Sequence, residues 1–220
     1  MNIGAALADV AAYGGFFAIT VGGDPDGWVP VHRCYDAGCH DLIQRTAAGY
    51  GTTDLRIGAS LVQFSHASRL WSPALATAIA HGVVPDLTDL QRRDTATELR
   101  LPVPTGRPVD PNGVARQLYT LVVEQHLEPL AAGLRVKMAP RLLYGNAAAA
   151  LVAAASQLVS ARPQVRAETV ALTETLLATG DLVGTGTMTG LQFTRRSCCL
   201  FYRVPGGSYC GDCALACRRQ

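Results

Sequence analysis

The chain has 220 residues, of which 49% are hydrophobic and 16% are charged. This composition excludes an intrinsically disordered chain and predicts one domain with a sizeable hydrophobic core. The 19 basic and 17 acidic residues leave a formal net charge of +2, which does not favour nucleic acid as a partner.

The first half of the sequence predicts helices joined by loops and a few short strands. Apolar residues at helical spacing, together with Gly and Pro breaks, place the boundaries. The predicted elements are helices over 3–13, 40–49, 54–69 and from Ser72-Pro73 to Gly82, a strand over 16–21, a loop over 24–35, and two short strands between Gly82 and Pro104.

The second half predicts three more helices and then two strands. Proline at a helix start and glycine at a helix end are the main signals. The predicted elements are a helix from Asp110-Pro111 that Pro129 kinks or ends, a helix from Pro140 to Arg162-Pro163, a helix from about 166 to Gly180, and strands over 187–193 and 199–204.

The segment between Arg141 and Arg162 contains 20 uncharged residues, which is long enough to cross a bilayer. Alanine partitions weakly into membranes, and several polar residues dilute the strongly apolar ones. We therefore expect a closely packed buried helix and no transmembrane segment.

These elements predict an α+β fold: a mainly helical body over 1–183 with short antiparallel strands, and a cysteine-rich C-terminal hairpin over 184–220 packed on that body. No Lys or Arg precedes Arg33, and Asp9 interrupts the early apolar run, so no export signal is expected. The expected location is the cytoplasm, where free thiols and metal thiolates persist.

Four cysteines near the C-terminus carry the strongest functional signal. Cys198 and Cys199 are adjacent, Cys210 follows after ten residues, and Cys213 after two more. A C-x2-C step lets two sulfurs reach one metal from a tight turn. Adjacent residues on a strand point to opposite faces, so both sulfurs face one centre only where the chain bends. A 2Fe-2S cluster relaxes this demand, because its ligand positions are spread over two irons.

These residues resemble a known family. The cysteine spacing, the surrounding CCLFYRVPGGSYCGDC and the upstream MAPRLLYGNAAAAL are similar to the FhuF-like ferric-siderophore reductases. The resemblance implies a 2Fe-2S cluster held by Cys198, Cys199, Cys210 and Cys213. It also implies one-electron reduction of siderophore-bound iron(III), which releases iron in the cytosol. The electron donor would be a ferredoxin or a flavin/NAD(P)H-dependent reductase.

Several side chains near the cysteines are candidates for supporting roles. We hypothesise that Arg195, Arg196 and Arg203 raise the cluster potential and help to dock an anionic partner or the electron donor. The alternative is that they are solvated cations on a hairpin. Tyr209, beside Cys210, is a candidate apolar wall for a siderophore.

Two tryptophans and one asparagine complete the candidates. Trp28 is a further candidate for the apolar wall of a siderophore pocket. Trp71 continues a helical stripe and is expected in the core. Asn146 is expected to be a hydrogen-bonded core amide, with support of the site as the alternative.

The remaining three cysteines are not assigned to a metal. Cys34 and Cys39 lie close to two histidines, but their spacing is tighter than in usual zinc modules, so incidental thiols in a loop that runs into a helix are predicted. Cys217 is expected to be a free terminal thiol, with a substitute ligand as the alternative.

Three other functions remain open from the sequence. One is a structural zinc protein, which the adjacent cysteine pair disfavours. Another is a thiol-disulfide switch through Cys210 and Cys213, which lacks the expected strand-to-helix setting. The last is a cluster-bearing electron carrier or redox sensor with a protein partner, which only a siderophore-dependent activity would separate from a reductase.

Overall fold

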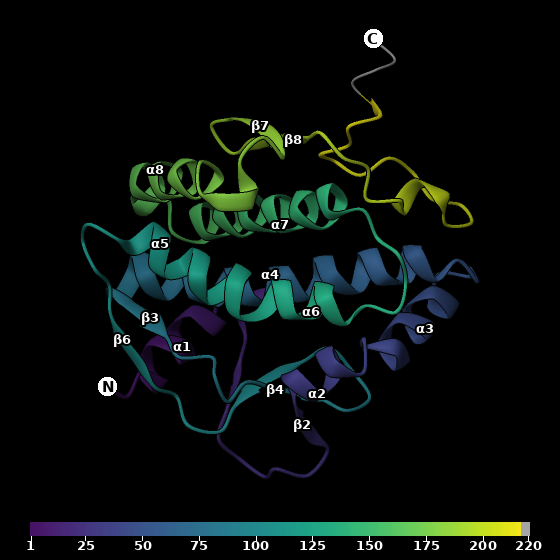
Figure 1. Ribbon diagram of the computed structural model, residues 1–220. Helices are drawn as coiled ribbons and strands as arrows, with labels where there is room; N and C mark the ends of the chain where they lie inside the picture. Colours follow the sequence, from purple (N-terminus) through teal and green to yellow (C-terminus); the bar gives the residue numbers. More distant parts are fainter. Residues whose placement is uncertain (217–220) are drawn as a thin grey trace.

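Two long helices form the centre of the protein. In the computed structural model, which describes residues 1–216, α4 (Leu55–His81) lies side by side with α7 (Pro140–Ala161). Helix α7 packs on one side of α4 together with α8 (Arg166–Leu177) and the two strands that follow α8, and the strands that precede residue 110 lie on the other side (Figure 1). The C-terminal segment runs over one end of this helical pair.

The chain is 55% helical, so the predicted α+β class with a mainly helical body is confirmed. The other α-helices are α1 (Gly4–Ala11), α2 (Val31–Asp36), α3 (His40–Gly49), α5 (Val114–Tyr119), α6 (Glu128–Gly133) and α8 (Arg166–Leu177). The 3-10 helices are η1 (Gly15–Phe17), η3 (Pro163–Val165), η4 (Gly180–Leu182) and η5 (Phe201–Arg203), and η2 (Thr120–Leu127) is a π-helix.

The strands are short and form three small sheets. The first has the order β1-β5-β4-β2, in which β1 and β5 are parallel and the other pairs are antiparallel. The other two are the antiparallel pairs β3-β6 and β7-β8. The strands are β1 (Thr20–Val21), β2 (Trp28–Pro30), β3 (Val83–Pro85), β4 (Gln91–Arg93), β5 (Leu99–Leu101), β6 (Gly106–Pro108), β7 (Gly186–Thr189) and β8 (Gln192–Arg195).

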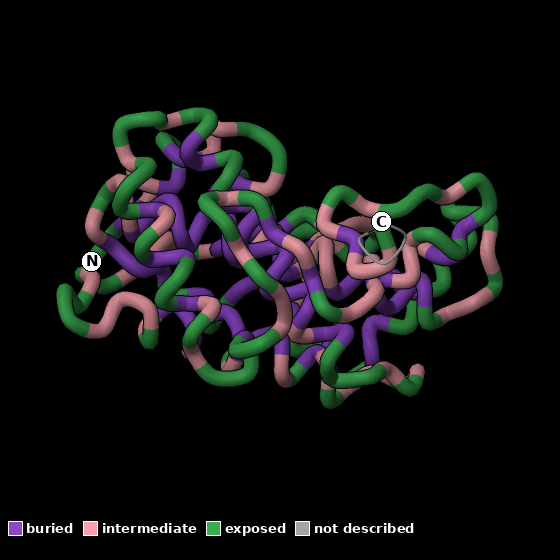
Figure 2. The backbone as a smooth tube through the Cα atoms, turned by 90° about the horizontal axis from the view of Figure 1, so that it is seen from above, coloured by how far each residue is buried: buried purple, intermediate pink, exposed green. Residues whose placement is uncertain are grey.

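The core lies where α4 and α7 meet. Figure 2 shows buried residues running through the middle of the molecule and exposed residues on the outer loops. Trp71 on α4 is fully buried, as predicted, and so are Ala148 and Ala150 on α7. Small alanine side chains let two helix backbones approach closely. Helix α7 is apolar and long enough to cross a membrane, but 78% of its most apolar window is buried inside the protein, which fits the buried helix that the sequence predicts.

Two predicted helix breaks are absent because tertiary packing overrides the local signals. The predicted helices over 54–69 and 73–82 are one helix, with Pro73 inside it. Residues 70–77 are all buried, so burial on every face offsets the lost backbone hydrogen bond. Pro129 does not end its helix either, because it follows the π-helix η2 and lies at the start of α6. The wider π turn accommodates the proline ring.

The N-terminal region departs from the predicted pattern. The predicted strand over 16–21 is the helix η1 followed by the two-residue strand β1, and the predicted loop over 24–35 contains β2 and most of α2. Between Gly82 and Pro104 three strands form instead of two. Pairing with distant partners stabilises these short strands, and local sequence carries little information about it.

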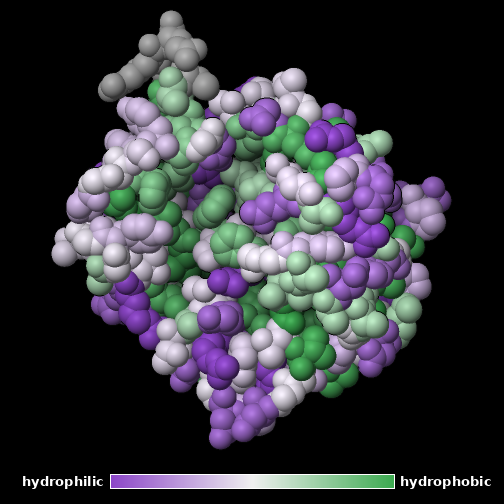
Figure 3. All heavy atoms as spheres, turned by 180° about the vertical axis from the view of Figure 1, so that it is seen from behind, coloured by the Kyte–Doolittle hydropathy of each residue, from purple (hydrophilic) through white to green (hydrophobic). Residues whose placement is uncertain are grey.

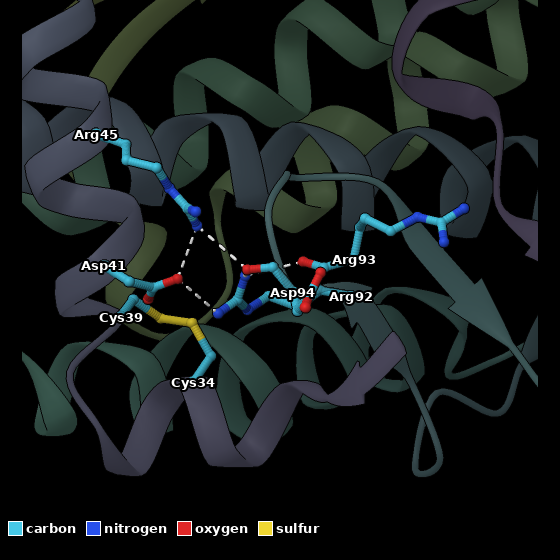
Figure 4. A network of polar contacts seen from close by, with 7 residues as sticks. All are labelled: Cys34, Cys39, Asp41, Arg45, Arg92, Arg93 and Asp94. Atoms are coloured by element: carbon cyan, nitrogen blue, oxygen red, sulfur yellow. Dashed lines mark hydrogen bonds and ion pairs between the residues drawn. A yellow bond between two sulfur atoms is a disulfide. The ribbon is translucent and has the colours of Figure 1, made fainter. Parts of the chain in front are cut away.

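Cys34 and Cys39 are joined by a disulfide, so the prediction of incidental thiols is wrong. The bridge connects α2 to the start of α3 (Figure 4). The Asp41 carboxylate beside it accepts hydrogen bonds from Arg45 at 2.8 Å and Arg92 at 3.0 Å. Gly38 and Cys39 both have positive φ, and this tight turn brings the two sulfurs together.

Gly58 provides a test of the packing between α3 and α4. A Cβ at this position would collide with the Ile43 carbonyl oxygen and lie 3.2 Å from the Ala47 Cβ. We expect Gly58→Ala to lower the free energy of unfolding by about 2 kcal/mol, because overpacking strains a close-packed interface. Urea unfolding measures this value.

Gly49→Ala, in α3, is the matched control. Nothing lies within 4 Å of a Cβ added at Gly49, so this variant should be as stable as the unchanged chain or slightly more stable. Equal stability of the two variants would contradict the close approach of α3 and α4.

Candidate functional site

The segment that contains the adjacent cysteines bends sharply. Leu200 has φ of 68°, a left-handed conformation that is uncommon for residues other than glycine. The predicted strand over 199–204 is therefore wrong, and the helix η5 begins at Phe201. The backbone N–H of Leu200 donates to Cys198 Sγ at 3.3 Å, and that of Phe201 donates to Cys199. The chain therefore bends directly after the adjacent cysteines, at Leu200.

The C-x2-C segment forms a second turn. The backbone N–H of Cys213 donates to the Cys210 carbonyl oxygen at 3.1 Å, and the N–H of Leu215 donates to Cys213 Sγ at 3.4 Å. Cys198 and Cys213 thus each accept an N–H bond from the residue two positions later. Such donors favour the thiolate form of cysteine.

The Sγ atoms of Cys199 and Cys210 lie 3.5 Å apart, which brings together sulfurs from both halves of the motif. Cys199 and Cys213 are buried, and Cys198 and Cys210 are half-buried. Within residues 1–216, no three Cys, His, Asp or Glu side chains converge on a single metal position. Cys217 lies outside the described residues.

A chain of buried hydrogen bonds holds the cysteine segment on the helical body. Arg195 Nη2 donates to Asn146 Oδ1 at 2.7 Å, and Asn146 Nδ2 donates to the Ser60 carbonyl oxygen at 3.0 Å. Ser60 Oγ in turn donates to the Cys199 carbonyl oxygen at 2.7 Å. These contacts link β8, α7, α4 and the adjacent cysteines. Asn146 is thus the hydrogen-bonded core amide that the sequence predicts, and its bond from Arg195 also connects it to the cysteine segment.

Arg195 also holds the second cysteine turn. Its backbone N–H donates to the Asp212 carbonyl oxygen at 3.1 Å, and its Nε lies 3.1 Å from Asp212 Oδ2. Its side chain is only 2% exposed. Arg195 is therefore not a solvated cation, and its role in docking or in tuning a cluster stays a prediction.

The other three candidates near the cysteines are exposed. Arg196 Nη1 donates to the Gly184 carbonyl oxygen at 3.5 Å, and Arg203 pairs with Asp54 at 3.3 Å. Tyr209 is 39% exposed, and its ring lies 6.1 Å from that of Tyr202. Their roles in docking or in tuning a cluster stay predictions.

The surroundings of Cys199 and Cys210 shift the pKa values of their thiols in opposite directions. Hydrogen bonding between Cys199 and Cys210 lowers the pKa of Cys199 and raises that of Cys210, so the pair shares one proton. The Arg195 charge lowers the pKa of Cys199 further. Burial raises the pKa of Cys198. The site therefore favours the thiolate form at Cys199.

A pocket of about 390 Å³ opens directly beside Cys199 and Cys210. Four aromatic residues that the sequence analysis did not single out contribute to its lining: Phe16, Tyr50, Phe64 and Phe201. Neither Trp28 nor Tyr209 is among its described lining residues. The four come from segments that are distant in sequence, so no local motif marked them.

A second polar cluster is buried in the helical body. The Tyr35 hydroxyl lies 2.6 Å from His66 Nε2 and 3.0 Å from His126 Nδ1. Burial lowers the pKa of His66 to about 3 and that of His126 to about 4, so both rings are neutral at pH 7. The sequence offered no spacing signal for this cluster, whose members come from α2, α4 and η2.

Asn146 provides a test of the hydrogen-bond chain. Asn146→Ala leaves the buried Arg195 guanidinium without one of its partners, which costs more for a charged group than for a neutral one. We expect the free energy of unfolding to fall by about 3 kcal/mol in urea titrations. Ser160→Ala is the control, because Ser160 is an exposed residue on the same helix. A loss as small as that of Ser160→Ala would show that the hydrogen bonds of Asn146 contribute little to the stability of the protein.

The buried histidines predict a loss of stability in acid. Their folded pKa values lie below the value of about 6.5 in an unfolded chain, so the unfolded state takes up protons first as the pH falls. Stability from these groups is complete above about pH 6.5. It then decreases toward pH 4 by roughly 1 kcal/mol per pH unit for each histidine.

His126→Gln should make this decrease shallower between pH 6.5 and 5, as measured by urea midpoints at each pH. His32→Gln is the control, because His32 is exposed on α2. An unchanged slope in His126→Gln would contradict the neutral, buried state of that ring.

Comparison with known proteins places the cysteine segment in a described family. Residues 195–215 match the family model of the FhuF 2Fe-2S C-terminal domain. The matched segment begins at the buried Arg195 and contains all four cysteines of the motif. No curated protein matches the chain. The family resemblance seen in the sequence is thereby confirmed, whereas the domain boundary between 183 and 184 stays a prediction.

Proposed function

We propose that this chain is an FhuF-like iron–sulfur oxidoreductase that reduces siderophore-bound iron(III) to iron(II). The observation that carries the proposal is the match of residues 195–215 to a 2Fe-2S domain. The bend at Leu200 and the contact between Cys199 and Cys210 support it, because they draw both halves of the cysteine motif together.

The residues present fit a 2Fe-2S cluster. Four cysteine sulfurs are the usual ligand set of such a cluster, and we propose Cys198, Cys199, Cys210 and Cys213 for it. Backbone N–H groups already point at the sulfurs of Cys198 and Cys213. Such hydrogen bonds stabilise negative charge on the ligands and raise a cluster potential. When bound, the cluster supplies one electron at a time.

The proposed role of the helical body is to position the cysteine segment. Arg195, Asn146 and Ser60 hold the cysteine segment against α4 and α7. The pocket beside Cys199 and Cys210 offers a binding surface next to the proposed ligands. Reduction weakens the hold of hard oxygen donors on iron, and other ligands then capture the metal. Such a reaction needs no general acid, base or nucleophile from the protein.

The partners follow from this chemistry. The substrate is a ferric siderophore, and the electron donor is a ferredoxin or a flavin/NAD(P)H-dependent reductase. The proposed location is the cytoplasm, although a disulfide such as Cys34–Cys39 is unusual in that compartment.

The cluster is tested by a visible spectrum of protein purified without oxygen, before and after dithionite. About two irons and two acid-labile sulfides per chain are expected, with loss of colour on reduction. Cys213→Ser should lose most of the iron and the colour, because one ligand is removed. Cys34→Ser is a matched control that should retain both.

The reductase activity is tested separately by trapping iron(II) with a chromogenic chelator after adding a ferric siderophore and reduced ferredoxin. Turnover that requires the intact cysteine motif is expected. A colourless protein with one zinc per chain would overturn the cluster and leave a structural metal site. A coloured protein without siderophore turnover would leave an electron carrier or sensor.

A further inference from the structure

The pocket beside Cys199 and Cys210 has the size and lining of a small-molecule site. Its volume is about 390 Å³, within the range of ligand pockets. Segments around Phe16, Tyr50 and Phe201 form part of its wall, and one face of α4 closes it. The side of the molecule opposite to that in Figure 1 is hollowed below the C-terminal end, and hydrophobic side chains gather in the hollow (Figure 3).

The pocket has no free positive charge to offer a ligand. Arg195 is the only cation among the described residues that line it, and its side chain lies 3.1 Å from that of Asp212. Burying an anion without an unpaired cation is costly. The pocket therefore favours an uncharged group over an anion.

Aromatic rings form a corner on one side of the pocket. The rings of Tyr50 and Phe201 lie 5.9 Å apart and are nearly perpendicular, at 88°. A flat ring placed against this corner can stack on one aromatic ring and meet the edge of the other, and both arrangements are favourable. The hydroxyl groups of Thr46 and Ser65 also line the pocket, and they can hydrogen-bond a carbonyl or phenol on a bound ring.

We propose that this pocket binds an uncharged planar aromatic ring directly beside the cysteine motif. The ring can come from two sources, the aryl cap of a siderophore or a quinone that exchanges electrons at the site. The inference goes beyond the proposed function, because binding rests on the pocket lining and not on the presence of a cluster.

The test is calorimetric titration of the full chain with one probe for each source. The siderophore probe is 2-(2-hydroxyphenyl)oxazoline. The quinone probe is 2,3-dimethyl-1,4-naphthoquinone, which has no free quinone-ring position for addition of a thiol. We expect saturable binding of at least one probe, and the one that binds identifies the source. Salicylate, which is anionic, and 2-cyclohexyloxazoline, which is not aromatic, should each bind at least about tenfold more weakly.

Two tyrosines provide matched variants. Tyr50 is 45% exposed and lines the pocket, whereas Tyr202 is 42% exposed and is not among its described lining residues. Tyr50→Ala should weaken binding of the ring about tenfold, and Tyr202→Ala should change it less than twofold. Both substitutions are at exposed positions, and circular dichroism checks that each variant is folded.

A Cys198→Ser variant separates this inference from the proposed function. Cys198 is not among the described lining residues, so ring binding should persist in this variant even where the cluster is lost. Three results would overturn the inference: no binding of either probe, equal binding of the anionic or cyclohexyl compound, or equal effects of the two tyrosine variants.

Discussion

The buried Arg195 guanidinium is the interaction on which the candidate site depends. A charged group that is 2% exposed is tolerated only beside an opposite charge or a hydrogen-bond acceptor, because its desolvation is costly. Asn146 accepts one of its hydrogen bonds, and Asp212 lies beside its Nε. These partners belong to α7 and to the C-x2-C turn. The requirement to pair one buried charge therefore fixes the cysteine segment in place.

The helical body supplies the rigidity that the cysteine segment lacks. Residues 196–216 contain little regular structure beyond η5, and short irregular segments bury too little apolar area to hold one conformation alone. The close pair of α4 and α7 forms a firm base beneath them. Gly145 allows the closest approach, because a Cβ there would collide with the Ser197 hydroxyl. The cysteine segment is thus held in place where it contacts α4 and α7, whereas Tyr202 and Tyr209 on its outer side are exposed.

Periodicity and spacing carried much of the information in this sequence. The helices over 40–49 and from Pro140 to Ala161 were predicted with their observed bounds, because glycine and proline at helix ends act locally. The buried nature of α7 followed from its alanine content. The cysteine spacing and the residues around it resembled a known family, and the match of residues 195–215 to a C-terminal domain of that family confirms the resemblance over this segment.

Other features were decided only in the folded chain, because they join residues that are distant in sequence. Pairing of Cys34 with Cys39 needs a turn with two positive φ values, and the continuity of α4 through Pro73 needs burial on all faces. The environment of Arg195 is the clearest case: the sequence left open whether it is a solvated cation or acts on the site, and only the fold shows that Asn146, 49 residues away, accepts its hydrogen bond inside the protein. The sequence by itself determined the spacing of the four cysteines and the family that this segment resembles. The tertiary structure decided what surrounds them, because burial and hydrogen-bond partners depend on contacts between distant segments.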